Sequence, residues 1–527
     1  MTAPASTPRS GGASRVFSGI LLSRILGLLR QRLFGHWFGD GEAADAVNAA
    51  MRIPNFLQNL FGEGVLSASF IPVYARLLAE GRKEEAGRVA GAIGALLALA
   101  TAVMVLAGIA VAPWLIAFIA PGFTGEKRDL TVLLVRVMFP GVGLLVWSAW
   151  CLGVLNSHRR FFLAYAAPIA WNLVLIGALV VAGPRQEEAP LAVTFALASV
   201  AGAFLQFAVQ LPAVLRLDRA LRFELGLSLA PVRDVLRSFT PVLVGRGVVQ
   251  LSGYIDNALA SLMGTGAVAM LNYAQPITML PVSLFGMAVS AAELPAMASV
   301  SADAEGAVVL RERLAAGLRR ISFYVIPSAV AFLVLGDVVG GALYRTGRFG
   351  SEQVLWLWTV LAGSAVGLVA GTLGRLYAST CYALRDTRTP LRFALIRVTL
   401  TLILGWLGAI VLPRWLGIDA KWGVAGLTAS AGLAAWVEFA LLRRALAARI
   451  GAVARVRGEV ALLWALALGA AGLAFGAKVM LGAMPAWVLA AVVLPVFAVT
   501  YVAGAWRAGV PAATELTHRL RRRPGVR

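Results

Sequence analysis

Several charged residues occur inside segments that are otherwise apolar enough to lie in a membrane. Arg24 and Arg30 fall in one such segment, residues 15–39. A charge in a membrane helix is costly, so it usually faces a polar cavity or a partner and marks function. Guanidinium groups bind phosphate oxygens through two parallel hydrogen bonds, and several converging arginines suit a diphosphate. The chemistry that these residues favour is therefore the binding of a phosphorylated anion.

The next segment, residues 43–75, carries a polar stripe. Asp45, Arg52 and Glu63 share one helical face with two asparagines, because they follow each other at helical spacing. A helix that faces only lipid would not tolerate this stripe, so it must line water, a ligand or another polar helix. We expect Arg52 to add a cation to the anion site, and Asp45 and Glu63 to limit the positive charge there.

The second half of the chain has fewer cations within its apolar segments. Arg246 lies in the segment 234–263 and Arg375 in the segment 352–383. For all of these charges the alternative is an internal ion pair, or a side chain that reaches the membrane surface from near a helix end. For Arg246, a structural pair with Asp256 is an equally good interpretation.

The elements that must position these side chains are membrane helices. Hydrophobic residues make up 59% of the 527 residues and charged residues only 14%, against roughly 25% charged residues in soluble domains. Apolar runs long enough to cross a bilayer recur along nearly the whole chain. They predict an all-α polytopic membrane protein with about fourteen transmembrane helices, over residues 15–39, 43–75, 86–119, 130–156, 160–182, 189–216, 234–263, 266–299, 315–344, 352–383, 391–412, 422–447, 458–481 and 485–508. We expect bends in the second and the eighth, because Pro54, Pro276 and Pro281 remove backbone donors inside them.

The loop charges orient these helices. Basic residues cluster after every even-numbered span, with roughly thirty Lys and Arg on that side against about eight on the other. The positive-inside rule then places both termini in the cytoplasm, which an even number of helices requires. The net charge of +21 is therefore mainly topological, because most of it lies beside anionic lipid head groups. We expect no nucleic-acid partner.

The two halves of the chain contain matching segments. Asn48–Pro72 resembles Asn272–Pro295, and Cys151–Asn156 resembles Cys381–Asp386. An even number of helices separates the copies, so they share one orientation. This pattern predicts two parallel-repeat six-helix lobes around a central cavity, an architecture of transporters.

The repeat divides the chain into four expected parts. They are an N-terminal lobe over residues 1–225, a C-terminal lobe over 226–450, two additional helices over 451–510, and a basic cytoplasmic tail over 511–527.

Signals of catalysis and of metal binding are absent from the sequence. It contains no GxSxG, no HExxH and no glycine-rich phosphate loop. Its two cysteines, Cys151 and Cys381, make neither a disulfide framework nor a metal cluster. We expect a protein that is not an enzyme and that uses no metal or other cofactor.

Short motifs along essentially the whole chain resemble those of the MurJ/MviN family. They include Ser23-Arg-Ile-Leu-Gly27 with Arg30, Ala44-Asp45-Ala46, Pro54-Asn55, Phe61-Gly62-Glu63-Gly64, Ala120-Pro-Gly-Phe123 and Asp386-Thr-Arg-Thr-Pro390. That family belongs to the multidrug/oligosaccharidyl-lipid/polysaccharide exporter superfamily. The resemblance implies a flippase that carries the lipid-linked peptidoglycan precursor, lipid II, from the cytoplasmic to the outer face of the inner membrane by alternating access.

The resemblance also implies roles for particular residues. Arg24 and Arg30 match cavity arginines that the family needs for flipping, and Asp45 and Glu63 match its acidic cavity positions. The last two helices would form a groove for the polyprenyl tail.

Two positions depart from the pattern of the family. Gln58 stands where the family commonly has an arginine, and Gln275-Pro276 stands where it commonly has an Asp-Arg pair. Arg52 supplies a cation near the first of these positions, and Arg246 and Arg375 are the candidates to compensate for the second.

Three other functions stay open on the sequence. One is a flippase for another polyprenyl-diphosphate-linked oligosaccharide, the second a cation-coupled drug antiporter of the same superfamily, and the third a non-transporting scaffold. The arginines of the first helix argue against the antiporter. The expected partners are lipid II, membrane lipids and enzymes of cell-wall synthesis, and the expected state is a monomer in the inner membrane.

Overall fold

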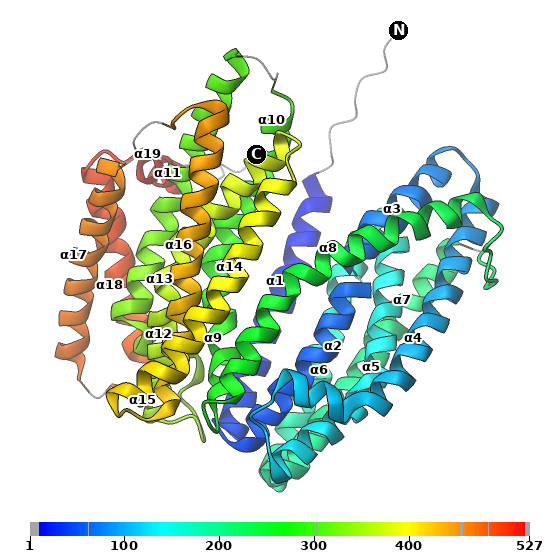
Figure 1. Cartoon of the computed structure of the whole chain (residues 1–527), viewed down its shortest axis with the longest axis horizontal. Coiled ribbons are helices and arrows are strands. Elements are labelled where there is room, and N and C mark those ends of the chain that lie inside the picture. The colour runs from blue at the N-terminus through cyan, green and yellow to red at the C-terminus, as the bar shows by residue number, and fades with distance from the viewer. Residues whose placement is uncertain are drawn as a thin grey trace. The chain divides into compact units, whose positions relative to one another are not determined.

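The computed structural model describes residues 10–61, 63–218, 220–300, 304–453, 457–482 and 484–521. Within these ranges the chain is helical apart from turns, loops and one isolated bridge between Thr346 and Phe349 (Figure 1). Ten helices of the described part are long and apolar enough to cross a membrane. The chain is therefore an all-α, multi-pass membrane protein, as predicted.

Two compact units divide the chain, Met1–Ala258 and Leu259–Arg527. The first unit contains α1 (Ser10–Phe38), α2 (Glu42–Phe61), α3 (Glu63–Ala79), α4 (Lys83–Ile119), α5 (Gly125–Ser157), α6 (Phe161–Ala182), the 3₁₀ turn η1 (Gly183–Arg185), α7 (Glu188–Leu217) and all but the end of α8 (Ala230–Ser261).

The second unit contains more and shorter elements. They are α9 (Ala267–Pro281), the π-helix η2 (Val282–Met287), α10 (Ala288–Ala298), α11 (Ala304–Val334), α12 (Gly336–Tyr344), α13 (Ser351–Ala383), α14 (Arg388–Trp406), the π-helix η3 (Leu407–Val411), α15 (Leu412–Leu416), the 3₁₀ turn η4 (Ala420–Trp422), α16 (Gly423–Ile450), α17 (Arg457–Leu481), α18 (Ala486–Arg507) and α19 (Pro511–Arg521).

The predicted spans coincide with these helices, but some of them are interrupted. The span 43–75 is covered by α2 and α3, which lie on either side of residue 62, outside the described residues, and Pro54 lies inside α2. In the span 266–299 the π-helix η2 begins directly after Pro281. A proline has no amide to donate, so the regular helical pattern gives way there.

Each unit is built around one central helix. In the first unit α5 packs against α2, α3, α4 and α7, and α6 packs against α7. In the second unit α13 packs against α9, α10, α11 and α16, and α14 packs against α16. The helices of the first unit named here thus correspond in order to those of the second unit, and each corresponding pair has corresponding neighbours.

Helix ends and side-chain bonds repeat as well. Arg159 and Arg385, just after α5 and α13, both adopt left-handed backbone conformations, with φ of 59° and 58°. Such a conformation is uncommon for a residue other than glycine. The offset between these arginines is 226 residues, whereas the offset between Cys151 and Cys381 is 230 residues. The ends of α5 and α13 therefore align about one helical turn away from the match of the two cysteines. In the other matched pair, Asn48 and Asn272 each donate from Nδ2 to the carbonyl four residues earlier.

Two polar side chains satisfy carbonyls that prolines leave without a helical donor. Pro113 in α4 cannot donate to Ile109, and the Nε of Arg136 donates to that carbonyl instead, at 3.3 Å. Pro327 in α11 cannot donate to Phe323, whose carbonyl accepts from the hydroxyl of Tyr501 at 2.8 Å. An unsatisfied carbonyl is costly in a membrane, so these side chains fasten α5 to α4 and α18 to α11.

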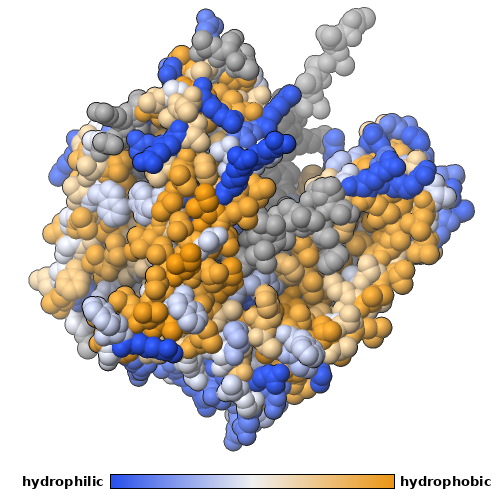
Figure 2. Space-filling view, in the orientation of Figure 1, coloured by the Kyte–Doolittle hydropathy of each residue, from blue (hydrophilic) through white to orange (hydrophobic). Residues whose placement is uncertain are grey.

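The outer faces of the helices are apolar. Figure 2 shows orange over the middle of the helices in each unit and blue towards their ends. On α14, for example, Leu395, Leu402 and Trp406 are exposed. Large exposed hydrophobic residues would be unfavourable in water, and they suit contact with lipid.

Candidate functional site

Arg30 lies on an aromatic platform inside the first unit. Its guanidinium carbon is 4.8 Å from the ring centroid of Trp171 on α6. Trp171 is fixed from α7, because its indole nitrogen donates to the carbonyl of Ser199 at 3.1 Å. A Cβ on Gly202 would lie 2.8 Å from the Trp171 ring, so only glycine leaves room for the platform. A cation held over an aromatic face keeps its charge and is already oriented for an anion.

Arg24 lies on the same helix and is exposed. Between the two arginines, α1 approaches α6 closely, since a Cβ on Gly27 would lie 3.9 Å from the Asn172 amide oxygen. The side chain of Asn172 is nearly buried, and its nitrogen donates to the carbonyl of Pro168 at 3.0 Å. The two predicted arginines therefore belong to one helix that packs on α6.

Arg52 lies at the contact between α2 and α8. Its Nη1 is 3.2 Å from the position that a Cβ on Gly253 would take, and its carbonyl accepts from the Tyr254 hydroxyl at 3.2 Å. The Tyr254 ring stands edge-on against Phe56, with centroids 5.1 Å apart. Asp256 is within electrostatic range of the guanidinium. Arg52 is thus within electrostatic range of Asp256 on α8, the acid that the sequence had suggested as a partner of Arg246.

Asp45 is paired with a cation, Lys127, that falls between the predicted spans 86–119 and 130–156. The Nζ of Lys127, in the first turn of α5, lies 2.5 Å from its carboxylate. The two side chains are 0% and 9% exposed, and the ammonium also lies 4.2 Å from the ring centroid of Phe123. A buried carboxylate needs such a partner, so this pair ties α2 to α5 and leaves the local charge balanced.

The remaining predicted residues of the first unit are placed only in part. Gln58 is half-buried on α2. Glu63 is the first residue of α3 and Arg246 lies within α8, but the side chains of both are outside the described residues.

Arg375 belongs to a charged group in the second unit. It is exposed on α13 and within electrostatic range of Arg397 on α14 and Glu438 on α16. Arg397 and Glu438 pair with each other at 3.0 Å. Arg375 is therefore a further cation close to the Arg397–Glu438 pair.

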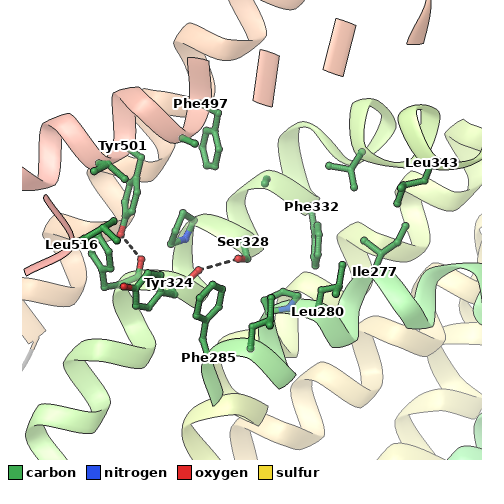
Figure 3. A pocket seen from close by; sticks show the side chains of 18 residues that line it. Ile277, Leu280, Phe285, Tyr324, Ser328, Phe332, Leu343, Phe497, Tyr501 and Leu516 are labelled. Atoms are coloured by element: carbon green, nitrogen blue, oxygen red, sulfur yellow. Dashed lines mark hydrogen bonds between the residues drawn. The ribbon is translucent and has the colours of Figure 1, made fainter. Parts of the chain in front are cut away.

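An apolar groove of about 390 Å³ runs along α11 in the second unit. Figure 3 shows aromatic and aliphatic side chains turned into it from several helices. α9 and η2 contribute Ile277, Leu280 and Phe285, and α18 contributes Phe497 and Tyr501. The ring of Phe285 stacks on Tyr324 with centroids 4.4 Å apart. Such a lining suits a hydrocarbon chain and offers nothing to a charged head group.

A titratable group at one end of the first unit had not been predicted. The hydroxyl of Tyr74 donates to Asp218 at 2.8 Å, and it is 2.9 Å from the Nε2 of His158. Burial lowers the pKa of His158 below its ordinary value; Asp218 opposes this effect, and Arg160 and Lys83 reinforce it. The imidazole is therefore held in its neutral form, with Nε2 donating to the Tyr74 oxygen.

Comparisons with known proteins agree with this arrangement. The family model described as "Lipid II flippase MurJ" matches residues 34–503. The chain is 32% identical to "Lipid II flippase MurJ" of Burkholderia cenocepacia over 434 residues, which cover 80% of each chain. The chain belongs to the MurJ family. The predicted resemblance is confirmed, and the chain is a transporter of the inner-membrane type rather than an enzyme.

Solved structures share the fold of this MurJ-family chain. A structure titled "Lipid II flippase MurJ, inward closed conformation" has a TM-score of 0.77 at 20% identity, covering 93% of this chain and 97% of that chain. An inward-facing multidrug resistance MATE family transporter of the MOP superfamily has a TM-score of 0.64 at 18% identity, covering 83% and 98%. The fold is therefore shared across the superfamily, and it does not by itself separate a flippase from a drug transporter.

Proposed function

We propose that this MurJ-family chain flips lipid II from the cytoplasmic to the outer face of the inner membrane, for cell-wall synthesis. The observation that carries the proposal is the pair of arginines on α1, with Arg30 oriented over Trp171 and Arg24 exposed beside it. Two guanidinium groups on one membrane helix suit the diphosphate of a lipid-linked sugar. They are poorly suited to a cationic drug.

The other predicted cations join this proposal with different roles. Arg52, next to Asp256, would bind the anion only when it turns away from that acid, so its role would depend on the step of the cycle. Gln58, Glu63, Arg246 and Arg375 stay predicted contacts of the substrate. Asp45, paired with Lys127, would act by balancing charge and holding α2 in place.

The finer architecture is part of the same proposal. Four further spans complete the fourteen, formed by α1, by α2 with α3, by α8, and by α9 with η2 and α10. The matching neighbours of α5 and α13 support two six-helix lobes with the predicted limits, residues 1–225 and 226–450. The basic loops support cytoplasmic termini. We propose a monomer that exposes its anion site alternately to the two sides of the membrane.

The polyprenyl tail would occupy the apolar groove along α11. One wall of this groove is formed by α18, the second of the two additional helices over residues 451–510. The expected tail, residues 511–527, starts with α19. The lining of the groove is hydrocarbon and aromatic, so transfer of an isoprenoid from lipid into it costs little.

The test is complementation in cells that are depleted of their own lipid II flippase. We expect the chain to sustain growth and the exposure of lipid II on the outer leaflet, and we expect Arg30→Ala to reduce both strongly at equal expression. Arg414→Ala is the matched control, because this arginine is exposed on α15 and lies outside the first unit. Unimpaired lipid II exposure with Arg30→Ala would overturn the assigned role.

A second candidate is a flippase for another polyprenyl-diphosphate-linked oligosaccharide. Gln58 and Pro276, which replace cations that the family commonly has, are the observations that favour it. In the same depleted cells this candidate predicts a well-expressed, correctly inserted protein that fails to restore growth.

A further inference from the structure

The aromatic platform of Arg30 lies in the middle of a membrane span. Trp171 stands midway along α6, about 15 Å from either end of this helix at about 1.5 Å per residue. Tryptophans of membrane proteins are enriched near the two surfaces of the bilayer, where their rings lie among the head groups. The ring of Trp171 lies at a different depth, so anchoring at the membrane surface does not explain it.

The helix that fixes this ring is α7, which carries none of the predicted site residues. The indole nitrogen of Trp171 donates to the Ser199 carbonyl at 3.1 Å. A Cβ on Gly202 would lie 2.8 Å from the side chain of Trp171 and 3.2 Å from its backbone. Because backbone atoms cannot rotate out of the way, only a glycine lets α7 approach α6 this closely. The position of the ring is therefore set by α7.

The ring acts on a cation in a way that a carboxylate does not. The guanidinium carbon of Arg30 lies 4.8 Å from the centroid of Trp171, and the face of an aromatic ring attracts a cation although the ring bears no net charge. Lys127 is instead held by the carboxylate of Asp45, whose negative charge opposes the approach of a second anion. Trp171 thus orients Arg30 without cancelling its charge.

We propose that Trp171 is a positioning residue of the anion site, and that α7 sets the orientation of Arg30 through it. The inference rests on the proposed function, because it takes Arg30 as a contact of the diphosphate. It adds that the affinity for the diphosphate depends on how α7 packs on α6, at the Ser199 carbonyl and at Gly202. Without the ring, the guanidinium would have to be ordered at each binding event, which lowers that affinity.

The first test measures binding of undecaprenyl diphosphate and of undecaprenol to the full chain in lipid nanodiscs. We expect Trp171→Leu to bind the diphosphate about fivefold more weakly and undecaprenol as the unaltered chain does. Trp171→Phe keeps an aromatic face but cannot donate to Ser199, so its affinity should lie between the two. Trp114→Leu is the matched control, because Trp114 is 79% exposed on α4 of the same unit.

The role of α7 is tested by Gly202→Ala, which keeps Arg30 and Trp171 but displaces the ring. We expect about fivefold weaker binding of the diphosphate for this variant as well. Gly177→Ala is the matched control on α6, since nothing lies within 4 Å of a Cβ there. Equal affinity of the two glycine variants for the diphosphate would overturn the part assigned to α7.

The decisive measurement repeats Trp171→Leu in a chain that already carries Arg30→Ala. A residue that acts only through Arg30 has no further effect once this arginine is absent, so the double variant should bind the diphosphate as Arg30→Ala does. A tryptophan with a merely structural role would weaken both probes in both backgrounds, and that result would overturn the inference.

Two further outcomes separate the inference from the proposed function. Equal affinity of Trp171→Leu and the unaltered chain for the diphosphate would overturn the role of Trp171 and leave the proposed function intact. If Arg30→Ala itself bound the diphosphate as tightly as the unaltered chain, the anion site of the proposed function would be contradicted, and the role of Trp171 with it.

Discussion

The segments α2–α3 and α9–η2–α10 occupy equivalent positions in their units, but they carry opposite chemistry. Both pack on the central helix, α5 or α13, and the second segment contains the π-helix η2. With Asn48 aligned on Asn272, Asp45 corresponds to Ala269 and Arg52 to Pro276. The first copy is therefore charged, whereas the second copy turns Ile277, Leu280 and Phe285 into an apolar groove.

The difference teaches how one repeated element can serve a substrate with two unlike ends. A lipid-linked sugar combines a diphosphate with a hydrocarbon tail, and no single surface suits both. The charged copy lies in the unit that contains Arg24 and Arg30, and the apolar copy lies in the unit that contains α18. We propose that the duplicated helix specialised, one copy for the head group and the other for the tail.

The largest expected effect concerns the buried pair of the charged copy. Lys127→Met leaves Asp45 fully buried without its cation, which should cost about 3–5 kcal/mol of stability. The thermal unfolding temperature measures this loss. The double variant Asp45→Asn with Lys127→Met should recover most of the loss, because the equivalent position Ala269 is buried without any charge. Equal stability of Lys127→Met and the unaltered chain would contradict the pairing.

The next largest effect concerns the anion site. Arg30→Ala should slow the flipping of lipid II in liposomes by about 10- to 100-fold, because one charge-assisted contact contributes roughly 1.5–3 kcal/mol. Arg30→Lys keeps the charge but loses the planar fork, so its activity should lie between the two. If the alanine and lysine variants flipped lipid II at the same reduced rate, the planar guanidinium of Arg30 would matter and its charge would not.

A smaller effect is expected in the apolar copy. Leu284 lines the groove and is 56% exposed, so Leu284→Asn should leave the fold unchanged. We expect about tenfold weaker binding of undecaprenol, because a leucine side chain in contact contributes roughly 1.5 kcal/mol. Leu402→Asn is the matched control, since Leu402 is 45% exposed on α14 and outside the groove. If both variants bound undecaprenol equally weakly, the groove would not be the binding site of the tail.

The smallest expected effect is a pH dependence of stability that arises at the end of the first copy and not at the end of the second. Two residues after the matched prolines stand Tyr74, bonded to His158, and Met297, whose sulfur accepts from Thr380. The pKa of His158 is lowered in the folded protein, so its contribution to stability is present above the unfolded pKa of about 6.5. That contribution is lost as the pH falls from there through the folded pKa.

The measurement for this prediction is the unfolding temperature at pH 7.5 and pH 5.5, values on either side of about 6.5. The unaltered chain should lose more stability on acidification than His158→Gln, which cannot gain the proton. Parallel losses in the two proteins would show that other groups dominate.

The sequence predicts the spans well because hydropathy is a local property. The limits of α5 and α18 fall within a few residues of the predicted 130–156 and 485–508. Arg30 could also be found, since a guanidinium inside an apolar segment is unusual. The repeat was detectable from Asn48 and Asn272, but the match of Cys151 with Cys381 differs by one turn from the alignment of the helix ends.

Contacts between distant residues were beyond sequence reasoning. Lys127 falls between two predicted spans, and its partner Asp45 lies 82 residues away, so the sequence does not pair them. Trp171 gave no signal as a platform, since an aromatic residue in a membrane helix is ordinary. Arg136 lies inside the predicted span 130–156, and only packing shows that it donates to the carbonyl freed by Pro113. Pairing across helices depends on rotation and depth, which hydropathy does not fix.

The most direct test of the division between head group and tail is a binding experiment with two ligands and two variants. Undecaprenyl diphosphate and undecaprenol share a tail and differ in the charged group. Arg30→Ala should weaken the binding of the diphosphate alone, by at least about tenfold, whereas Leu284→Asn should weaken the binding of both ligands equally. If Arg30→Ala weakened undecaprenol as much as the diphosphate, or if Leu284→Asn affected only the diphosphate, the division of the substrate between the two copies would be contradicted.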